Sequence, residues 1–153
     1  EGRMGLTPFH ERPDVEGAVA AASAVAGQFL ALDALWRIAA EAAPLDLSFR
    51  EDDQAPGRDG PTIGVIRDRA FQFYYPDNLE ALERQGATLT RINALKDPQL
   101  PDVDGLYIGG GFPETQAAEL ASNAGFCRSL KDAAERGLPI YAECGGLIYL
   151  GRS

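Results

Sequence analysis

The sequence predicts an α/β protein built on an open, mostly parallel β-sheet and preceded by a helical segment. From residue 62 onward, short apolar runs rich in β-branched residues alternate with longer amphipathic segments. Glycine or proline punctuates most of the junctions between them. Two of the apolar runs end in glycine-rich turns, at residues 109–111 and 144–146. In parallel α/β sheets, binding and catalytic sites form at the carboxyl ends of the strands, where both turns are expected.

The expected elements follow in chain order. One helix is expected between Val15 and Ala43, because apolar residues recur there at spacings of three and four, and Asp14 is placed to cap its first turn. Gly86 and Gly137 stand where two later helices should end. In full, strands are expected at 62–66, 87–92, 105–108 and 138–143, and helices at 75–86, 114–120 and 124–136.

Residues 45–61 are typical of a linker, because they are polar and contain both helix breakers. This linker separates a helical part, 1–44, from an α/β part, 62–153. The chain starts without methionine and stops one or two turns into the helix expected after Cys144. We therefore expect a fragment of a longer protein whose α/β domain is incomplete at its C-terminus. Its uncovered surface predicts either self-association, as a homo-oligomer, or a disordered C-terminus.

Composition restricts the possible partners. The 153 residues carry a formal net charge of −9, which disfavours binding to nucleic acid. No apolar run approaches the length of a membrane span and no signal peptide is recognisable, so we expect no membrane association and a cytoplasmic location. Two cysteines are too few for a disulfide framework and lack the spacing of a zinc site, so neither a disulfide nor a metal site is expected.

The stretch 138–150 has the pattern of a strand, a sharp turn and a helix, with Cys144 at the turn. Ala142, Gly145 and Gly146 are small enough for the close backbone approach that such a turn requires. A cysteine just before a helix also feels the positive end of the helix dipole, which lowers a thiol pKa. Cys144 is therefore a candidate nucleophile. The alternative is a small apolar residue that closes a buried strand, and the local pattern leaves both interpretations open.

The glycine triplet at 109–111 matches neither a phosphate-binding P-loop nor a dinucleotide-binding fingerprint, so no cofactor is assigned to it. It is either a tight connection or part of an active site. A backbone N–H from this turn and the N–H of Gly145 are able to converge on one oxygen, as an oxyanion hole requires. Two such turns at one sheet edge indicate acyl transfer.

Other chemically interesting residues have simpler interpretations. Cys127 lies in a helical pattern and is expected to be filler in the core or at the surface. The aromatic residues within 71–75 are expected to pack, although a loop at that strand end is also able to face a substrate or a neighbouring domain. Glu143 is able to cap, to pair or simply to end a strand. His10, the single histidine, lies in the N-terminal part and is a poor candidate for the base of Cys144.

Three blocks of the sequence, at 71–79, 104–114 and 141–147, resemble the glutamine amidotransferase domain of the cobyrinic acid a,c-diamide synthases of cobalamin biosynthesis. Their order is the family's order, over about residues 62–153. The N-terminal part resembles, less distinctively, the end of the ATP-dependent synthetase domain of those enzymes. The fold that the resemblance implies is the flavodoxin-like sheet of the class I glutamine amidotransferases.

The resemblance implies a reaction at two sites. Cys144 would attack the side-chain amide of glutamine, the co-substrate, to give a thioester and ammonia. The backbone N–H groups of Gly145 and Gly110 would hold the oxyanion. A synthetase domain would use ATP and magnesium to amidate the a and c carboxylates of a corrinoid, cobyrinic acid. No residue of this chain is assigned to ATP, to magnesium or to the corrinoid.

The sequence also departs from the family. The family's catalytic histidine follows the cysteine, and residues 145–153 hold none. We therefore expect little or no glutaminase activity from this polypeptide alone, and measurable turnover of glutamine would refute that expectation. Three alternatives stay open: a cobyric acid synthase, whose amidotransferase domain is similar, a non-catalytic doubly wound binding domain, and a cysteine-dependent redox or stress protein.

Overall fold

The computed structural model describes residues 14–44 and 60–151, and the chain divides into two units, Glu1–Arg50 and Glu51–Ser153. The predicted linker at 45–61 lies almost wholly outside the described residues, as does His10. Each unit has its own internal structure and is described separately.

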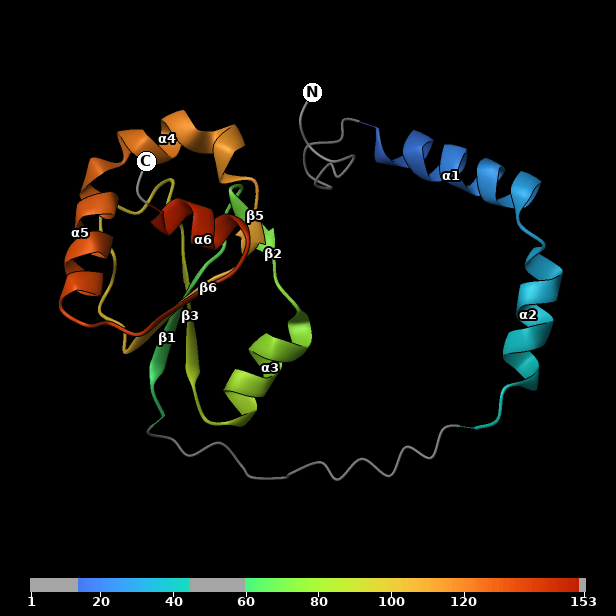
Figure 1. The fold of residues 1–153 in the computed structure, drawn as a ribbon, viewed down its shortest axis with the longest axis horizontal. Coiled ribbons are helices and arrows are strands. Elements are labelled where there is room, and N and C mark those ends of the chain that lie inside the picture. The colour runs from blue at the N-terminus through green and yellow to red at the C-terminus, as the bar shows by residue number, and fades with distance from the viewer. Residues whose placement is uncertain (1–13, 45–59, 152–153) are drawn as a thin grey trace. The chain divides into compact units, whose positions relative to one another are not determined.

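The first unit contains two helices, α1 (Val15–Phe29) and α2 (Leu32–Glu41) (Figure 1). The expected cap is confirmed, because the Asp14 carboxylate accepts a hydrogen bond from the Gly17 N–H at 2.7 Å. The expectation of one continuous helix is wrong. Leu30 is extended, with φ −108° and ψ 134°, and α1 and α2 meet at a bend of 82°. Leucine is a good helix former, so helix propensity gives no sign of this break.

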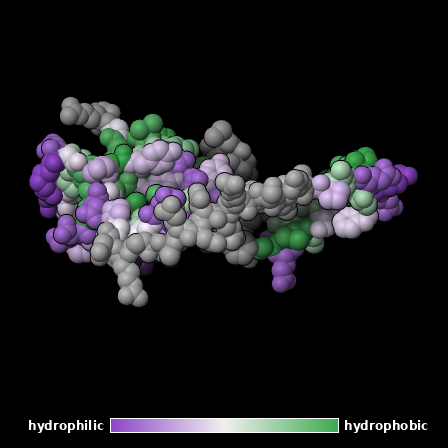
Figure 2. Space-filling model, turned by 90° about the horizontal axis from the view of Figure 1, so that it is seen from below, coloured by the Kyte–Doolittle hydropathy of each residue, from purple (hydrophilic) through white to green (hydrophobic). Residues whose placement is uncertain are grey.

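The helices of the first unit expose apolar side chains, and Figure 2 shows green patches on this unit. The exposed fractions reach 72% for Phe29 and 79% for Trp36. Within the described ranges, no single helix is long and apolar enough to cross a membrane. Of the helices in these residues, α1 and α2 taken together across their bend have the length and apolar composition of such a span.

The second unit is built on a parallel sheet of four strands in the order β3-β1-β4-β6. All three strand pairs are parallel, and Ile66 aligns with both Ile92 and Ile108. The open parallel α/β fold predicted from the sequence is therefore confirmed. The strands are β1 (Thr62–Ile66), β3 (Thr88–Ile92), β4 (Gly105–Ile108) and β6 (Ile140–Ala142).

Helices connect these strands and cover the sheet (Figure 1). Helix α3 (Pro76–Arg84) leads to β3, while α5 (Ala124–Glu135) leads to β6. These connections run in opposite directions along the sheet, so right-handed crossovers place α3 and α5 on opposite faces. The helix expected at 114–120 is instead a short 3-10 helix, η2 (Pro113–Gln116), followed by α4 (Ala117–Ser122).

Both glycines expected to end helices have a positive φ, 94° at Gly86 and 93° at Gly137, as a left-handed helix end requires. The main core lies between the sheet and the helices α4 and α5 that cover one of its faces. Its largest fully buried side chains are Phe71, Phe126, Ile66, Ile92 and Ile108. This core fixes the carboxyl ends of the strands, where the two glycine-rich turns lie.

Candidate active site

Cys144 stands between β6 and the last described helix, α6 (Gly145–Leu150), in a strained backbone conformation. Its φ is 47° and its ψ is −113°, and it is the only non-glycine residue with positive φ in the described ranges. Such a conformation costs an L-residue about 1–3 kcal/mol and is found mostly at functional sites. The Cys144 side chain is exposed. A strained turn therefore presents this thiol to solvent.

Gly145 and Gly146 allow α6 to begin at this point. A Cβ on Gly145 would lie 2.7 Å from the Gly111 carbonyl oxygen. A Cβ on Gly146 would lie 2.5 Å from the Ile108 carbonyl oxygen. Neither distance leaves room for a side chain, so the close backbone approach expected from the sequence is observed. Gly145 is the first residue of α6, where the helix itself offers no acceptor to the backbone N–H.

Backbone hydrogen bonds join the two glycine-rich turns. The Glu143 N–H donates to the Ile108 carbonyl at 3.0 Å, which extends the pairing of β6 with β4. The Gly146 N–H lies 2.8 Å from the Glu143 carbonyl oxygen and 3.2 Å from that of Gly109. A Cβ on Gly110 would lie 3.6 Å from the Cys144 Cβ. The structure thus brings all three predicted site residues, Cys144, Gly145 and Gly110, to one sheet edge.

The second turn is a short strand, which the sequence did not reveal. Gly110 and Gly111 form β5, which pairs antiparallel with β2 (Phe71–Phe73). The partners are Phe71 with Gly111 and Phe73 with Gly110. A Cβ on Gly111 would lie 1.9 Å from the Ala70 carbonyl oxygen, so only glycine fits. The alternation of Phe71, Gln72 and Phe73 was the available signal, but a three-residue strand is too short to stand out.

Tyr74 follows β2 and links the end of β1 to the glycine-rich turn after β4. Its hydroxyl donates to the Ile66 carbonyl and accepts the Gly109 N–H at 2.9 Å. Its ring packs on Gly109, where a Cβ would lie 2.6 Å from the Tyr74 Cζ. Burial raises the pKa of Tyr74 above its ordinary value, with smaller contributions from nearby groups, so the hydroxyl keeps its proton. Sequence reasoning expected this residue to pack, with a loop facing a substrate or a neighbouring domain as the alternative, and did not single out its hydroxyl.

The Glu143 carboxylate is paired with Tyr107 of the neighbouring strand β4. The Tyr107 hydroxyl donates to the Glu143 carboxylate. The pKa of Tyr107 is raised, first by burial and next by this bond to a carboxylate. The rings of Tyr74 and Tyr107 meet edge to face with their centroids 5.1 Å apart. Of the three roles open to Glu143 from the sequence, the structure shows pairing.

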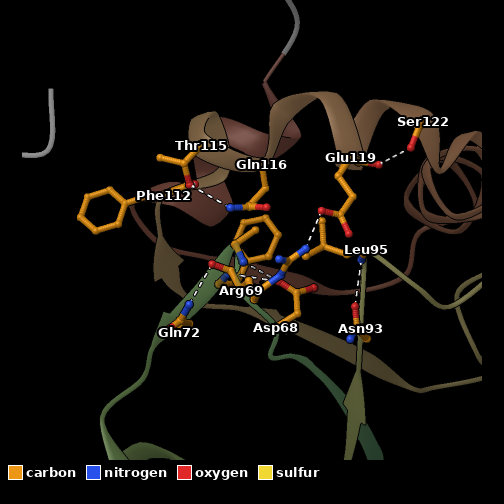
Figure 3. A network of polar contacts seen from close by, with 12 residues as sticks. Asp68, Arg69, Gln72, Asn93, Leu95, Phe112, Thr115, Gln116, Glu119 and Ser122 are labelled. Atoms are coloured by element: carbon orange, nitrogen blue, oxygen red, sulfur yellow. Dashed lines mark hydrogen bonds and ion pairs between the residues drawn. The ribbon is translucent and has the colours of Figure 1, made fainter. Parts of the chain in front are cut away.

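Asp68 is a buried carboxylate that the sequence analysis missed, and Figure 3 shows it among the polar contacts near α4. It accepts the Ala70 N–H and the Ala94 N–H, each at 2.8 Å, and the Phe71 N–H at 3.3 Å. Burial raises its pKa, although these N–H donors act in the opposite direction. By binding backbone on both sides, Asp68 ties the loop after β1 to the loop after β3.

An ion pair on the surface lies beside this buried carboxylate (Figure 3). The Arg69 guanidinium contacts the Glu119 carboxylate at 2.6 Å and so links the loop after β1 to α4. Both side chains are about half exposed, so the pair contributes little to stability. The ion pair therefore marks where α4 contacts the loop after β1.

The other cysteine lies away from the turn. Cys127 is half-buried in α5, with its sulfur 3.6 Å from the Tyr149 hydroxyl and 3.5 Å from the Leu120 carbonyl oxygen. These contacts agree with the packing role expected for it. Among residues 14–44 and 60–151, no group of three or more histidine, cysteine or acidic side chains is placed to hold a metal ion.

An open apolar groove of about 570 Å³ lies between α3 and the sheet. Its lining comes from α3, β4 and β6 and includes Asn78, Tyr107 and Tyr141, but not Cys144. The groove is therefore separate from the strained turn.

Comparison with known proteins places the amino-acid sequence in a family. Residues 62–153 match the model of the CobB/CobQ-like glutamine amidotransferase domain. The chain is 42% identical over 150 residues to the cobyrinate a,c-diamide synthase of Archaeoglobus fulgidus, covering 98% of this chain and 32% of that protein. It is 56% identical over 94 residues to the enzyme of that name from Methanosarcina acetivorans, covering 61% of this chain and 19% of that protein.

The similarity extends to bacterial proteins. The chain is 40% identical over 153 residues to a cobyrinate a,c-diamide synthase of Listeria monocytogenes, covering 100% of this chain and 34% of that protein. The chain spans about a third of the length of the curated relatives that it matches over its whole extent. No solved structure gives a significant match. Because the family model covers the whole parallel sheet and the strained Cys144 turn, the chain belongs to the family of CobB/CobQ-like glutamine amidotransferase domains.

Proposed function

We propose that this chain is the glutamine-hydrolysing part of a cobyrinate a,c-diamide synthase and that Cys144 is its nucleophile. The observation that carries the proposal is the φ of 47° at Cys144, on an exposed thiol at the carboxyl edge of the sheet. A strained strand-to-helix turn is the geometry that presents a nucleophile to substrate. The similarity to proteins with that name supports the choice of enzyme.

The proposed chemistry is acyl transfer through a thioester. The Cys144 thiolate attacks the carbonyl carbon of the glutamine side-chain amide and forms a tetrahedral oxyanion. The C–N bond then breaks, and the nitrogen takes up a proton and leaves as ammonia. Water attacks the thioester next, releasing glutamate and restoring the thiol. The proton for ammonia is assigned to no residue of this chain.

Two backbone N–H groups are proposed to stabilise the oxyanion. Gly145 provides the first, because its N–H stands at the start of α6, directly after the nucleophile. Gly110 is the predicted second donor and lies next to Cys144.

Gly111 is the competing second donor. The Phe112 N–H donates to the Ala70 carbonyl at 3.0 Å, toward β2. N–H groups alternate in direction along an extended strand, so the N–H of Gly110 is expected to point toward β2 as well and that of Gly111 away from it.

The ammonia would serve an amidation elsewhere in the enzyme. We propose that the complete protein uses ATP and Mg²⁺ to amidate the a and c carboxylates of cobyrinic acid. On this proposal residues 1–44 end the synthetase domain, 45–61 are a linker and 62–153 form the amidotransferase domain. Glutamine is then the one small molecule that the described residues bind. A cobyric acid synthase is the second candidate, because its amidotransferase domain is similar.

Labelling with the chloroketone analogue of L-glutamine tests the role of Cys144. In this analogue a chloromethyl ketone replaces the side-chain amide, and a thiolate displaces chloride to form a thioether. Trypsin separates the two cysteines into peptides 97–128 and 137–152, so mass spectrometry assigns the label. We expect saturable labelling of the Cys144 peptide that L-glutamine prevents and D-glutamine does not.

Two variants are the controls. Cys144→Ser should remove the label, whereas Cys127→Ser should leave it unchanged. Equal labelling of both cysteines, or labelling that L-glutamine does not slow, would contradict the proposed function and favour a non-catalytic domain. Oxidation of Cys144 by dilute peroxide without glutamine-protected labelling would favour the redox protein.

A further inference from the structure

The aromatic block at 71–75 contains one side chain that contacts the polar backbone of the site. Tyr74 is partly buried, and its hydroxyl lies between two strand ends. It donates to the Ile66 carbonyl at the end of β1 and accepts the Gly109 N–H, just after β4, at 2.9 Å. A hydroxyl that both donates and accepts here fixes the separation of the two strand ends.

Gly109 is held at both of its backbone polar groups. Its N–H is bound by Tyr74 at 2.9 Å, and its carbonyl accepts the Gly146 N–H at 3.2 Å. Because a peptide unit is planar, the carbonyl of Gly109 and the N–H of Gly110 share one rigid plane. The C=O and N–H of a trans peptide point in opposite directions, so the Gly109 carbonyl that accepts from Gly146 turns the Gly110 N–H away from α6. The bonds on Gly109 therefore set the path of the chain into Gly111.

The ring of Tyr74 has packing contacts that do not depend on its hydroxyl. It lies against Gly109, where a Cβ would be 2.6 Å from the Tyr74 Cζ, and it meets the Tyr107 ring at 5.1 Å. Replacing Tyr74 by phenylalanine keeps these ring contacts. Only the bonds to Ile66 and Gly109 are lost, which makes the substitution a specific probe of the hydroxyl.

We propose that Tyr74 is a positioning residue of the glutaminase site: its hydroxyl holds the backbone of Gly109 so that the Gly111 N–H of β5, the one expected to point away from β2, meets the oxyanion formed at Cys144. This inference rests on the proposed function. It assigns the second turn's geometry to a side chain that directly follows β2, far from Cys144 in the sequence. The hydroxyl touches neither substrate nor thiol, so its effect is indirect.

Two thiol reagents separate positioning from general stability. The glutamine chloroketone places a ketone oxygen where the amide oxygen would be, so its reaction depends on the oxyanion donors. Methyl methanethiosulfonate has no carbonyl. It transfers a methylthio group to a thiolate and releases methanesulfinate, so its rate reports only the exposure and ionisation of the thiol. Half-buried Cys127 serves as an internal reporter of unfolding.

The variants compared are Tyr74→Phe and Tyr75→Phe in the whole chain. Tyr75 loses the same hydroxyl but is 68% exposed, so it is the matched control. For Tyr74→Phe we expect the maximal chloroketone rate at Cys144 to fall roughly tenfold, a partial loss of one oxyanion donor. The half-saturating concentration of the chloroketone and the methanethiosulfonate rate should not change, and Tyr75→Phe should match the unsubstituted chain.

Each other outcome is decisive. An unchanged chloroketone rate in Tyr74→Phe overturns the positioning role while leaving the proposed function intact. Parallel loss with both reagents, or new methanethiosulfonate reactivity at Cys127, assigns the hydroxyl to general stability and also overturns it. If the unsubstituted chain shows no glutamine-protected labelling of Cys144, the proposed function itself fails, and the positioning role fails with it.

Discussion

The Tyr107 hydroxyl donates a hydrogen bond to the carboxylate of Glu143, the residue that directly precedes the strained Cys144. Glu143 is also held through its backbone N–H, which donates to the Ile108 carbonyl at 3.0 Å. Side chain and backbone together therefore fix the last residue before the turn. Four predictions follow from this geometry and from the burial around it.

Tyr107→Phe should lower the free energy of unfolding by about 1–2 kcal/mol, because it removes one bond to a charged group from a buried hydroxyl position. Tyr141→Phe is the control, since Tyr141 is 62% exposed and also packs its ring against Tyr107. Urea denaturation followed by circular dichroism measures both. Equal effects of the two substitutions would show that the bond to Glu143 does not stabilise the fold.

Cys144→Gly should give a more stable protein than Cys144→Ala, by about 1 kcal/mol. Glycine adopts positive φ without the steric cost that alanine retains, and this gain exceeds glycine's greater freedom in the unfolded chain. Both substitutions remove an exposed thiol, so burial does not differ between them. Thermal and urea unfolding provide the comparison. Greater stability of the alanine variant would mean that the turn is not strained in solution.

Gly146→Ala should destabilise the second unit by at least about 2 kcal/mol, since a Cβ there would lie 2.5 Å from the Ile108 carbonyl oxygen. Gly105→Ala is the matched control in the same unit, because its Cβ would meet only the Pro139 carbonyl oxygen at 3.7 Å. Urea midpoints of the two variants test this. A Gly146→Ala protein as stable as Gly105→Ala would contradict the close approach of α6 to β4.

Stability should fall at alkaline pH because the pKa values of Tyr74 and Tyr149 are raised above 10.0 in the folded protein, chiefly by burial. Below pH 10 both states keep these phenols neutral, so the contribution is fully present. Above it, only the unfolded chain ionises, and each such group removes about 1.4 kcal/mol per pH unit until its folded pKa is reached.

Tyr149→Phe tests the alkaline loss, with Tyr75→Phe as the exposed control. The free energy of unfolding is measured from about pH 9 upward, the range around the ordinary tyrosine pKa. Its slope against pH should be shallower than that of the unsubstituted chain in Tyr149→Phe and unchanged in Tyr75→Phe. Identical slopes in both variants would show that Tyr149 ionises at its ordinary pKa in the folded protein.

The sequence predicted the elements that depend on local patterns. The runs at 62–66 and 105–108 became β1 and β4, and Gly86 and Gly137 took the positive φ of helix ends. It did not foretell the break between α1 and α2 at Leu30, a good helix former. Nor did it show β2 and β5, whose pairing joins Phe71 to Gly111 with α3, β3 and β4 between them in the sequence. Contacts between distant residues decide such elements.

The candidate site divides in the same way. The order of small residues around Cys144 by itself determined that a sharp turn with room for a nucleophile stands between a strand and a helix, since backbone sterics act between neighbours. Only the tertiary structure decided what supports that turn. The register of β4 beside β6 places the Gly109 carbonyl near the Gly146 N–H, and the segment after β2 brings the Tyr74 hydroxyl to the Gly109 N–H. Hydrogen bonds of this kind depend on distance in space, which no local pattern records.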